Sequence, residues 1–152
     1  IIEKRNNFIE RLSLKVKDIY LNKNLKTIDD YAFYNSESLT RLYVDSTNLA
    51  DFKLGNNIFT KAGSKAKLQV SFLEGVTKIP ANFLFSNASE EESAVVSELV
   101  LPSSLTEVGK AAFYDLSIES IWYIGKEENY KAVKVNDQND SLAGVKFSIV
   151  IL

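Results

Sequence analysis

The chain has 152 residues and a formal net charge of −2, because 18 Lys and Arg are balanced by 20 Asp and Glu. This balance argues against nucleic acids and anionic membrane surfaces as partners, since both require clustered basic residues. There is no Cys and no His, which excludes disulfides, thiolate nucleophiles, imidazole bases and the usual zinc ligands. The sequence also lacks the run of about 18 apolar residues that a membrane-spanning helix needs.

The first clear element is a short strand at 19–21, and it opens a unit that recurs along the chain. Alternating apolar residues put every second side chain of such a strand on one face of a sheet. The same alternation predicts strands at 19–21, 42–44, 70–72, 99–101 and 121–123. One strong strand per period argues against a parallel β-helix, which needs about three short strands per turn.

The segments between these strands contain Gly, Asn and Ser and little heptad pattern, so we expect turns and short helical pieces. Residues 32–33 and 111–113 are expected to form one helical turn each, with Asp29 and Asp30 capping the first. Residues 87–93 (NASEEES) are expected to be a surface insertion that lengthens one copy.

Phenylalanine marks the period of the repeat. Phe8, Phe33, Phe59, Phe85 and Phe113 follow one another at intervals of 25 to 28 residues. A period of this length indicates one supersecondary unit copied along the chain. One copy cannot bury its own apolar face, so stacked copies must cover one another. We therefore expect the Phe residues to form an interior column rather than a cofactor site.

The repeated phrases resemble BspA-like leucine-rich repeats. The resemblance lies in residues 25–44, 76–87 and 99–125, which combine I-x-x-x-A-F with L-x-x-L-x-L. It implies an α/β solenoid, a leucine-rich-repeat right-handed superhelix with one short parallel strand per 22–29-residue repeat and short helical turns and loops on the convex side. The ladder position that usually holds Asn carries Thr47, Gly75 and Ser104 instead; the Thr and Ser hydroxyls can still bond backbone groups in the turn.

The expected organisation is a single domain over 1–152, taken to be a fragment of a longer protein. Residues 1–18 would be an N-terminal partial repeat or cap, 19–124 the repeats, and 125–152 a C-terminal capping element with a short helix, Tyr130 packed inward and a last strand. The resemblance further implies an extracellular or cell-surface protein that is active in adhesion or in binding host or matrix macromolecules.

The strand face that points away from the core is the candidate ligand-binding surface. Its two outward columns are Tyr20, Tyr43, Ser71, Val100, Trp122 and Asp18, Arg41, Gln69, Glu98, Ser120. Tyr and Trp give rigid contact area with a polar tip, so the candidate ligand-binding residues are Tyr20, Tyr43, Arg41, Gln69, Glu98, Val100 and Trp122. The alternative is that aromatic and β-branched residues stand there because they favour strands.

Other polar motifs have simpler interpretations. Glu90, Glu91 and Glu92 are interpreted as a solvated loop rather than a cation site, and 137–141 as a turn rather than a calcium loop, since it lacks EF-hand spacing. Asn87 and Asn139 begin glycosylation-type triplets. No catalytic motif is present, so we expect a non-enzymatic chain without cofactor or metal, favoured as a monomer. The binding-module hypothesis, with a protein or glycan as partner, competes with a structural spacer or an accessory domain of a secreted hydrolase.

Overall fold

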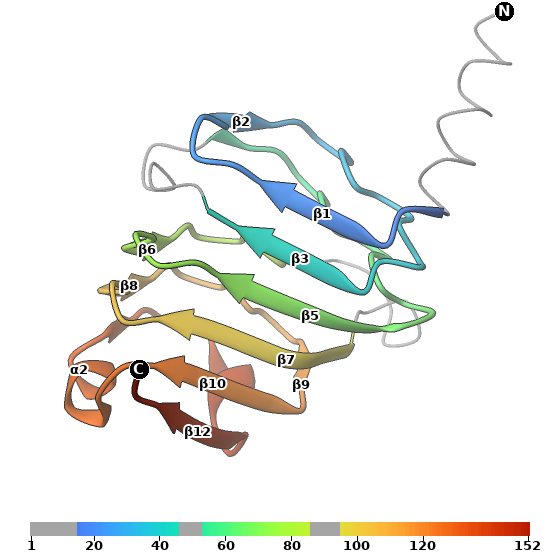
Figure 1. Ribbon diagram of the computed structural model, residues 1–152. Coiled ribbons are helices and arrows are strands. Elements are labelled where there is room, and N and C mark those ends of the chain that lie inside the picture. Colours follow the sequence, from blue (N-terminus) through green and yellow to red (C-terminus); the bar gives the residue numbers. More distant parts are fainter. Residues whose placement is uncertain (1–14, 46–52, 86–94) are drawn as a thin grey trace, which may run out of the picture.

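The computed structural model describes residues 15–45, 53–85 and 95–152. Its main feature is a parallel sheet of long strands stacked in chain order (Figure 1). The strands are β1 (Asp18–Leu21), β3 (Arg41–Val44), β5 (Lys67–Phe72), β7 (Val95–Pro102), β10 (Ser120–Ile124) and β12 (Lys146–Val150), and β9 (Ser117–Ile118) also pairs with β7. Each of the predicted strands lies within one of these elements. The chain is thus a parallel-strand solenoid of about 4 turns, which confirms the predicted fold class.

A second line of strands, each two residues long, runs behind the main sheet. These are β2 (Thr27–Ile28) paired with β4 (Lys53–Leu54), and β6 (Lys78–Ile79), β8 (Glu107–Val108) and β11 (Lys134–Val135) paired in a separate sheet. Sequence alternation does not reveal elements this short. Among the described residues from Asp18 onward, helix is confined to α2 (Glu127–Lys131) and the 3-10 helix η2 (Asp140–Leu142).

The helical turns expected at 32–33 and 111–113 are not formed, and that prediction was wrong. The chain makes hydrogen-bonded turns there, which contain residues with a left-handed backbone. At the first such position of each turn these residues are Tyr31, Asn57, Asn82, Ala111 and Gln138, and Asn35, Lys61 and Asp115 are left-handed four residues later in three of the coils. Asp30 caps no helix; its Oδ1 instead accepts a hydrogen bond from the backbone N–H of Asn56 in the next coil, at 2.6 Å.

Aromatic rings fill the interior between the two lines of strands. The ring of Phe33 stacks on Phe59 with centroids 5.4 Å apart, and Phe59 contacts Phe83 at 5.6 Å. Phe72 then joins Phe83 to Phe113, at 5.5 and 6.1 Å. The predicted interior column therefore exists, with one correction in its third member.

Phe85 does not belong to the interior column, although its spacing predicted that it would. Leu84 occupies the equivalent backbone position, because its N–H bonds the Ala112 carbonyl as that of Phe33 bonds the Ile58 carbonyl. Phe83, 1% exposed, supplies the interior ring. Phe85 is left half-buried outside, where its ring contacts Tyr114 at 5.0 Å. Phe8 lies outside the described residues.

Among the described residues, backbone hydrogen bonds at the ends of the short strands link successive coils except at one place. The N–H of Gly55 bonds Ile28 O at 2.7 Å, that of Gly109 bonds Ile79 O at 2.8 Å, and that of Asn136 bonds Val108 O at 3.0 Å. Pro80 holds the equivalent position in the coil between, and proline has no N–H to donate. The short-strand line is accordingly interrupted between β4 and β6. We call this interruption the Pro80 gap.

Polar side chains substitute for an asparagine ladder at some turns. As predicted for the ladder position, the Ser104 hydroxyl accepts from the N–H of Gly75 at 2.9 Å and donates to Val76 O at 2.8 Å. Thr47 lies outside the described residues. Asn139, only 6% exposed, accepts from Phe113 N and donates through Nδ2 to the carbonyls of Gly109 and Asn136.

The last segment of the chain continues both lines of strands. Tyr130 of α2 packs inward as predicted, with its ring 5.1 Å from Tyr123 and 4.5 Å from Phe147. β12 pairs with β10 in the long-strand sheet, and β11 pairs with β8 in the short-strand sheet. The division of the chain into cap, repeats and capping element stays a prediction.

Candidate ligand-binding face

The outward side chains of the long-strand sheet lie in columns because the parallel strands keep their register. We call this surface the open face and define it by the outward residues of β1, β3, β5, β7 and β10. The first predicted column is formed, with residues paired in the order Tyr20, Tyr43, Ser71, Val100 and Trp122. Across the second column, Asp18 pairs with Arg41, Arg41 with Gln69, and Gln69 with Glu98. All of the candidate ligand-binding residues therefore share one face.

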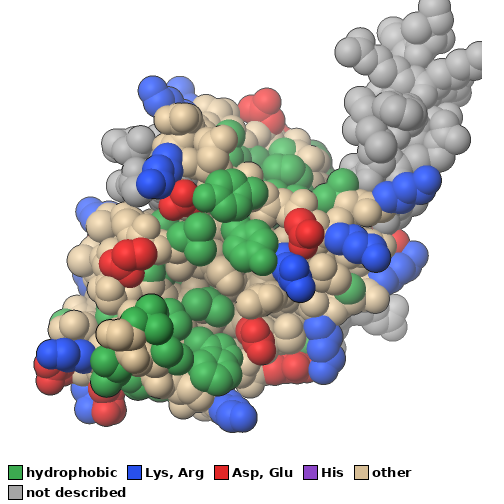
Figure 2. Space-filling model, viewed as in Figure 1, with side chains coloured by type: hydrophobic (Ala, Val, Ile, Leu, Met, Phe, Trp, Pro, Cys, Tyr) green, Lys and Arg blue, Asp and Glu red, His purple; other side chains and the backbone are tan. Residues whose placement is uncertain are grey.

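The aromatic column consists of two apolar patches separated by a small buried residue. Tyr20 is 56% exposed and its ring lies 6.3 Å from that of the half-buried Tyr43. Ser71, next in the column, is only 6% exposed. Val100 and Trp122 follow and are half-buried. Figure 2 shows apolar side chains gathered over this sheet without a described element packed across them.

Tyr20 is fixed in place at its outer end. Its hydroxyl donates a hydrogen bond to Asp45 Oδ2 at 2.7 Å. This bond raises the pKa of Tyr20 above its ordinary value of 10.0, with burial and the negative charge of Asp45 adding to the shift. The ring is thus a neutral, oriented contact surface at physiological pH, which suits recognition better than proton transfer.

The second column carries charges of both signs. Arg41 is exposed between Asp18 and the half-buried Gln69. Beside the column, Lys67 Nζ lies 3.0 Å from Glu119 Oε1. A face with mixed charges does not favour a strongly anionic or cationic partner, and exposed ion pairs of this kind contribute little to stability.

A cavity of 480 Å³ lies on the turn side, and a larger one of 630 Å³ adjoins the open face. The larger cavity lies where β5, β7 and β10 end, and it shares Val100 with the aromatic column. Apolar residues dominate its lining, with Glu74, Ser103, Lys126, Glu128 and Asn129 at polar positions. The apolar members are Phe72, Leu73, Val100, Pro102, Ile124, Ile151 and Leu152. Of these lining residues, the sequence analysis named only Val100 as a candidate ligand-binding residue. The signal for the others was their position after the strands, since the carboxyl ends of parallel strands meet at one edge of the sheet.

A buried tyrosine lies next to the lining of the larger cavity, because the Tyr123 ring packs beside Gly125. Tyr123 is fully buried, and among the described residues its hydroxyl has no hydrogen-bond partner. Burial, and secondarily the charge of Glu74, raises the pKa of Tyr123 above 10.0. Glu74 itself accepts from the Ser103 hydroxyl at 2.9 and 3.0 Å. A cavity with an apolar lining and a few convergent polar groups is typical of an anchoring pocket.

Neither metal-binding nor catalytic clusters stand out among the described ranges. No group of three or more Asp or Glu side chains within them could hold a metal ion. Residues 137–141 form a turn and the start of η2, as interpreted from the sequence. Asn139 is buried with its amide engaged, so its triplet is not an accessible glycosylation acceptor. The insertion at 87–93, with Asn87 and Glu90, Glu91 and Glu92, lies outside the described residues.

Fold and face together define a repeat solenoid whose parallel sheet is not covered by any described element. The family model for the BspA type leucine-rich repeat region matches residues 6–131 in 6 copies. The chain therefore belongs to the BspA-type leucine-rich repeat family. Domains of this family are typically surface binding modules and are generally non-catalytic. Searches of curated proteins and of solved structures give no match. In the portions of the chain that are described, no helix is long and apolar enough to cross a membrane.

Proposed function

We propose that this chain is a non-enzymatic binding module, extracellular or at a cell surface, that recognises a macromolecule through its open face. The observation that carries the proposal is the alignment of Tyr20, Tyr43, Val100 and Trp122 in one outward column, with Tyr20 exposed and the other three half-buried. Aromatic side chains of this kind are enriched among residues that dominate binding energy. The role is adhesion or recognition of host or matrix macromolecules.

The apolar cavity at the carboxyl ends of the strands supports a protein segment as the occupant. Its volume of 630 Å³ and its apolar lining suit one or two large side chains of a partner. Its polar members, Glu74, Lys126 and Glu128, include both charges, so they can orient a segment without demanding a charged one. A chain lying along the aromatic column would reach this cavity at Val100.

The test is a binding screen of the chain against displayed peptide libraries, immobilised matrix proteins and glycans. The decisive variant is Tyr43→Ala with Trp122→Ala, which removes a ring from each apolar patch. Loss of two dominant aromatic contacts is expected to lower the affinity for a true ligand by about 30-fold or more. Binding can also be followed directly through Trp122, the single Trp of the chain.

The matched control is Tyr34→Ala with Tyr114→Ala, which removes two partly exposed rings from the turn side. For a peptide or protein ligand, this control is expected to leave the affinity unchanged. If the control loses binding and the face variant retains it, the open face is not the binding surface. If no ligand emerges from the screen, the chain acts as a structural spacer or accessory domain.

A further inference from the structure

The Pro80 gap leaves a cavity on the turn side of the solenoid. The cavity has a volume of 480 Å³ and is lined by Leu54, Gly55, Asn56 and Asn57 from one coil and by Ala81, Asn82 and Phe85 from the next, with Tyr31 beside them. At the neighbouring Gly109 position, a Cβ would lie only 2.7 Å from Pro80 C and 2.8 Å from Ile79 O, so the coils there leave no such space. The cavity lies at the coil contact that proline interrupts; a second turn-side cavity, of 400 Å³, lies at the Gly55 contact and has Asp29, Asp30 and Lys53 in its lining.

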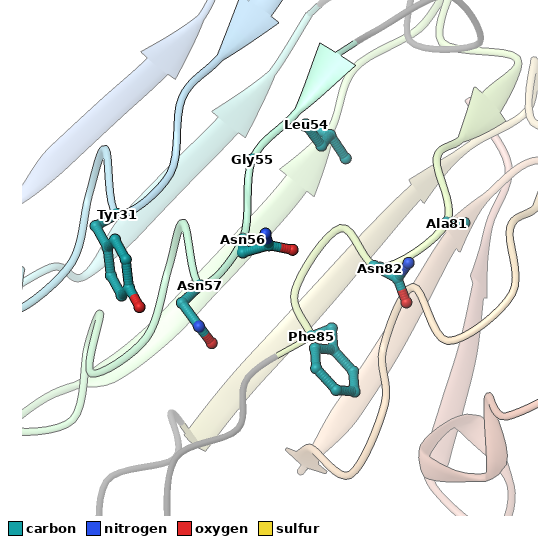
Figure 3. Close-up of a pocket in the computed structure, with 8 residues that line it drawn as sticks. All are labelled: Tyr31, Leu54, Gly55, Asn56, Asn57, Ala81, Asn82 and Phe85. Carbon is teal, nitrogen blue, oxygen red and sulfur yellow. The ribbon is translucent and has the colours of Figure 1, made fainter.

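The cavity combines flat aromatic rings with side-chain amides. Figure 3 shows Tyr31, the pair Asn56 and Asn57, and the pair Asn82 and Phe85 on three successive segments of the chain. None of its described lining residues carries a charge. This composition differs from the apolar cavity on the open face, and it selects for a neutral, polar ligand with a flat surface.

The amides of Asn56 and Asn82 and one backbone carbonyl have bonding capacity to offer. The side chains of Asn56 and Asn82 are exposed and form no hydrogen bond with the described residues. The carbonyl of Leu54 lacks the donor that its counterparts Ile28 and Ile79 receive from a glycine N–H, because residue 80 is proline. Each amide has two donors and one acceptor oxygen, so the site presents both kinds of group at close range.

The aromatic rings are held in position by neighbours. Tyr31 is 55% exposed, and its ring packs edge-on against Tyr34 at 5.6 Å. Phe85 packs against Tyr114 at 5.0 Å. Both rings thus keep an orientation without a ligand, which lowers the entropic cost of binding one.

We propose that this cavity is a carbohydrate subsite that takes a neutral pyranose sugar. A pyranose has an apolar C–H face that stacks on an aromatic ring, and hydroxyls that both donate and accept, as the Asn amides do. The volume lies within the range of about 300–1,000 Å³ that small-molecule sites occupy. The site is separate from the open face, so it goes beyond the proposed recognition of a macromolecule there.

The test uses ¹⁵N-labelled protein titrated with neutral saccharides: the methyl glycosides of glucose, galactose and mannose, N-acetylglucosamine, lactose and cellobiose. At least one is expected to shift the side-chain amide signals of Asn56 and Asn82 with a Kd on the order of 1 mM. Tyr31→Asn removes the ring and suits the left-handed backbone at φ 57°, so the fold is retained. It is expected to weaken binding about tenfold.

Two matched variants locate the effect. Tyr31→Phe keeps the ring and is expected to retain most of the affinity, and Tyr43→Ala with Trp122→Ala, on the open face, is expected to leave it unchanged. The proposal is overturned if no saccharide shifts these signals up to about 50 mM. It is overturned equally if Tyr31→Asn binds as tightly as the parent, or if only peptides shift the signals.

Discussion

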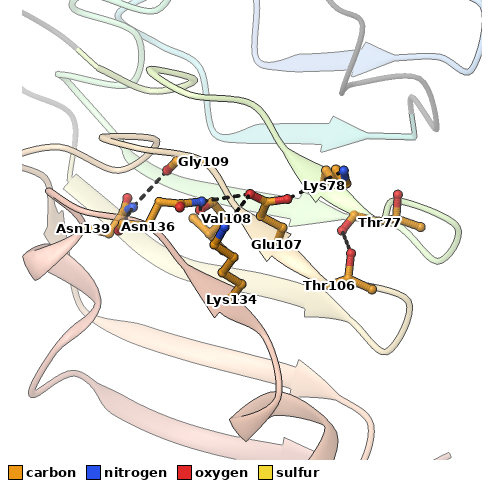
Figure 4. Close-up of polar contacts among 9 residues, drawn as sticks. All are labelled: Thr77, Lys78, Thr106, Glu107, Val108, Gly109, Lys134, Asn136 and Asn139. Carbon is orange, nitrogen blue, oxygen red and sulfur yellow. Dashed lines mark hydrogen bonds and ion pairs between the residues drawn. The ribbon is translucent and has the colours of Figure 1, made fainter.

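Two neighbouring coil contacts on the turn side are built differently, although the long-strand sheet in front of them is continuous. At the Gly109 contact, β6 pairs with β8 and the glycine N–H bonds Ile79 O. Figure 4 shows the polar groups that reinforce it, with Thr106 bonded to Thr77 and Glu107 between Lys78 and Lys134. At the Pro80 gap, β4 and β6 do not pair. The N–H that proline lacks distinguishes the two contacts, and the joined contact at Asn136 shows that a Cβ is compatible with pairing.

The largest loss of stability is expected from removing the buried amide of Asn139, which links the Gly109 coil to the coil that follows it. Asn139→Ala leaves the N–H of Phe113 and the carbonyls of Gly109 and Asn136 without their partner. Unsatisfied buried backbone groups cost about 1–3 kcal/mol each, so we expect a loss of about 3 kcal/mol in the free energy of unfolding. Chemical denaturation followed by the fluorescence of Trp122 measures it.

The control for this experiment is Asn129→Ala, at an exposed position in α2. It is expected to change stability by less than about 0.5 kcal/mol. Equal effects of the two variants would show that the Asn139 bonds do not hold the coils together.

A methyl group on Gly109 should force apart the contact between this coil and the preceding one. Its Cβ would collide with backbone atoms of the preceding coil rather than with a flexible side chain. Overpacking of this kind costs about 1–3 kcal/mol, and we expect about 2 kcal/mol for Gly109→Ala in thermal or urea unfolding. Pro80→Ala, at the equivalent position beside the gap, should change stability by less than half as much. A larger effect at Pro80 than at Gly109 would reverse the comparison.

A substitution in the coil that contains Gly109 should increase the free energy of unfolding, by a smaller amount. Ala111 has φ 56° in a turn where the gap side has Asn57 and Asn82. A left-handed backbone costs a residue with a Cβ about 1–2 kcal/mol, while glycine gains freedom in the unfolded chain. Ala111→Gly should therefore stabilise by about 0.5–1 kcal/mol, seen as a higher denaturation midpoint with an unchanged slope. A lower midpoint would mean that the left-handed backbone at Ala111 is not strained.

The smallest expected effect is a pH dependence at Glu107. A hydrogen bond from Asn136 Nδ2, at 3.0 Å, and the charges of Lys134 and Lys78 lower the pKa of Glu107 below its ordinary 4.5. A depressed carboxyl pKa stabilises the fold above the unfolded value, and this contribution disappears as pH falls through the folded pKa. Glu107→Gln should flatten the loss of stability below pH 4.5. An unaltered pH profile would assign that loss to other carboxyls.

The long strands and the open face were predictable because both depend on spacing within the repeat. The alternation of Leu42 and Val44 fixes which side chains point inward, and equal spacing puts Tyr43 beside Tyr20. Phe85 was misplaced because Phe83 stands two residues away and periodicity alone cannot choose between them. Asp30 was read as a helix cap because its partner, the N–H of Asn56, lies in the next coil.

Both cavities depend on distances between coils, which residue spacing does not report. The apolar cavity joins Leu73 to Ile151, residues far apart in the sequence. The turn-side cavity follows from Pro80, whose missing N–H has meaning only once Gly55 and Gly109 are known to occupy equivalent positions. The role of Asn139 is also hidden, since its sequence context resembles an ordinary polar turn.

The Pro80 gap has a mechanical consequence. Between Leu54 and Pro80 the tension of a pulled array would pass through the front sheet, where Arg41–Val44 pair with the strand that follows, and not through the short strands behind it. At the Gly109 contact both sheets share the load. Under force along the stacking axis, rupture should therefore begin at the Pro80 gap, between β4 and β6. The long-strand sheet would then act as the hinge about which the two halves of the solenoid rotate apart.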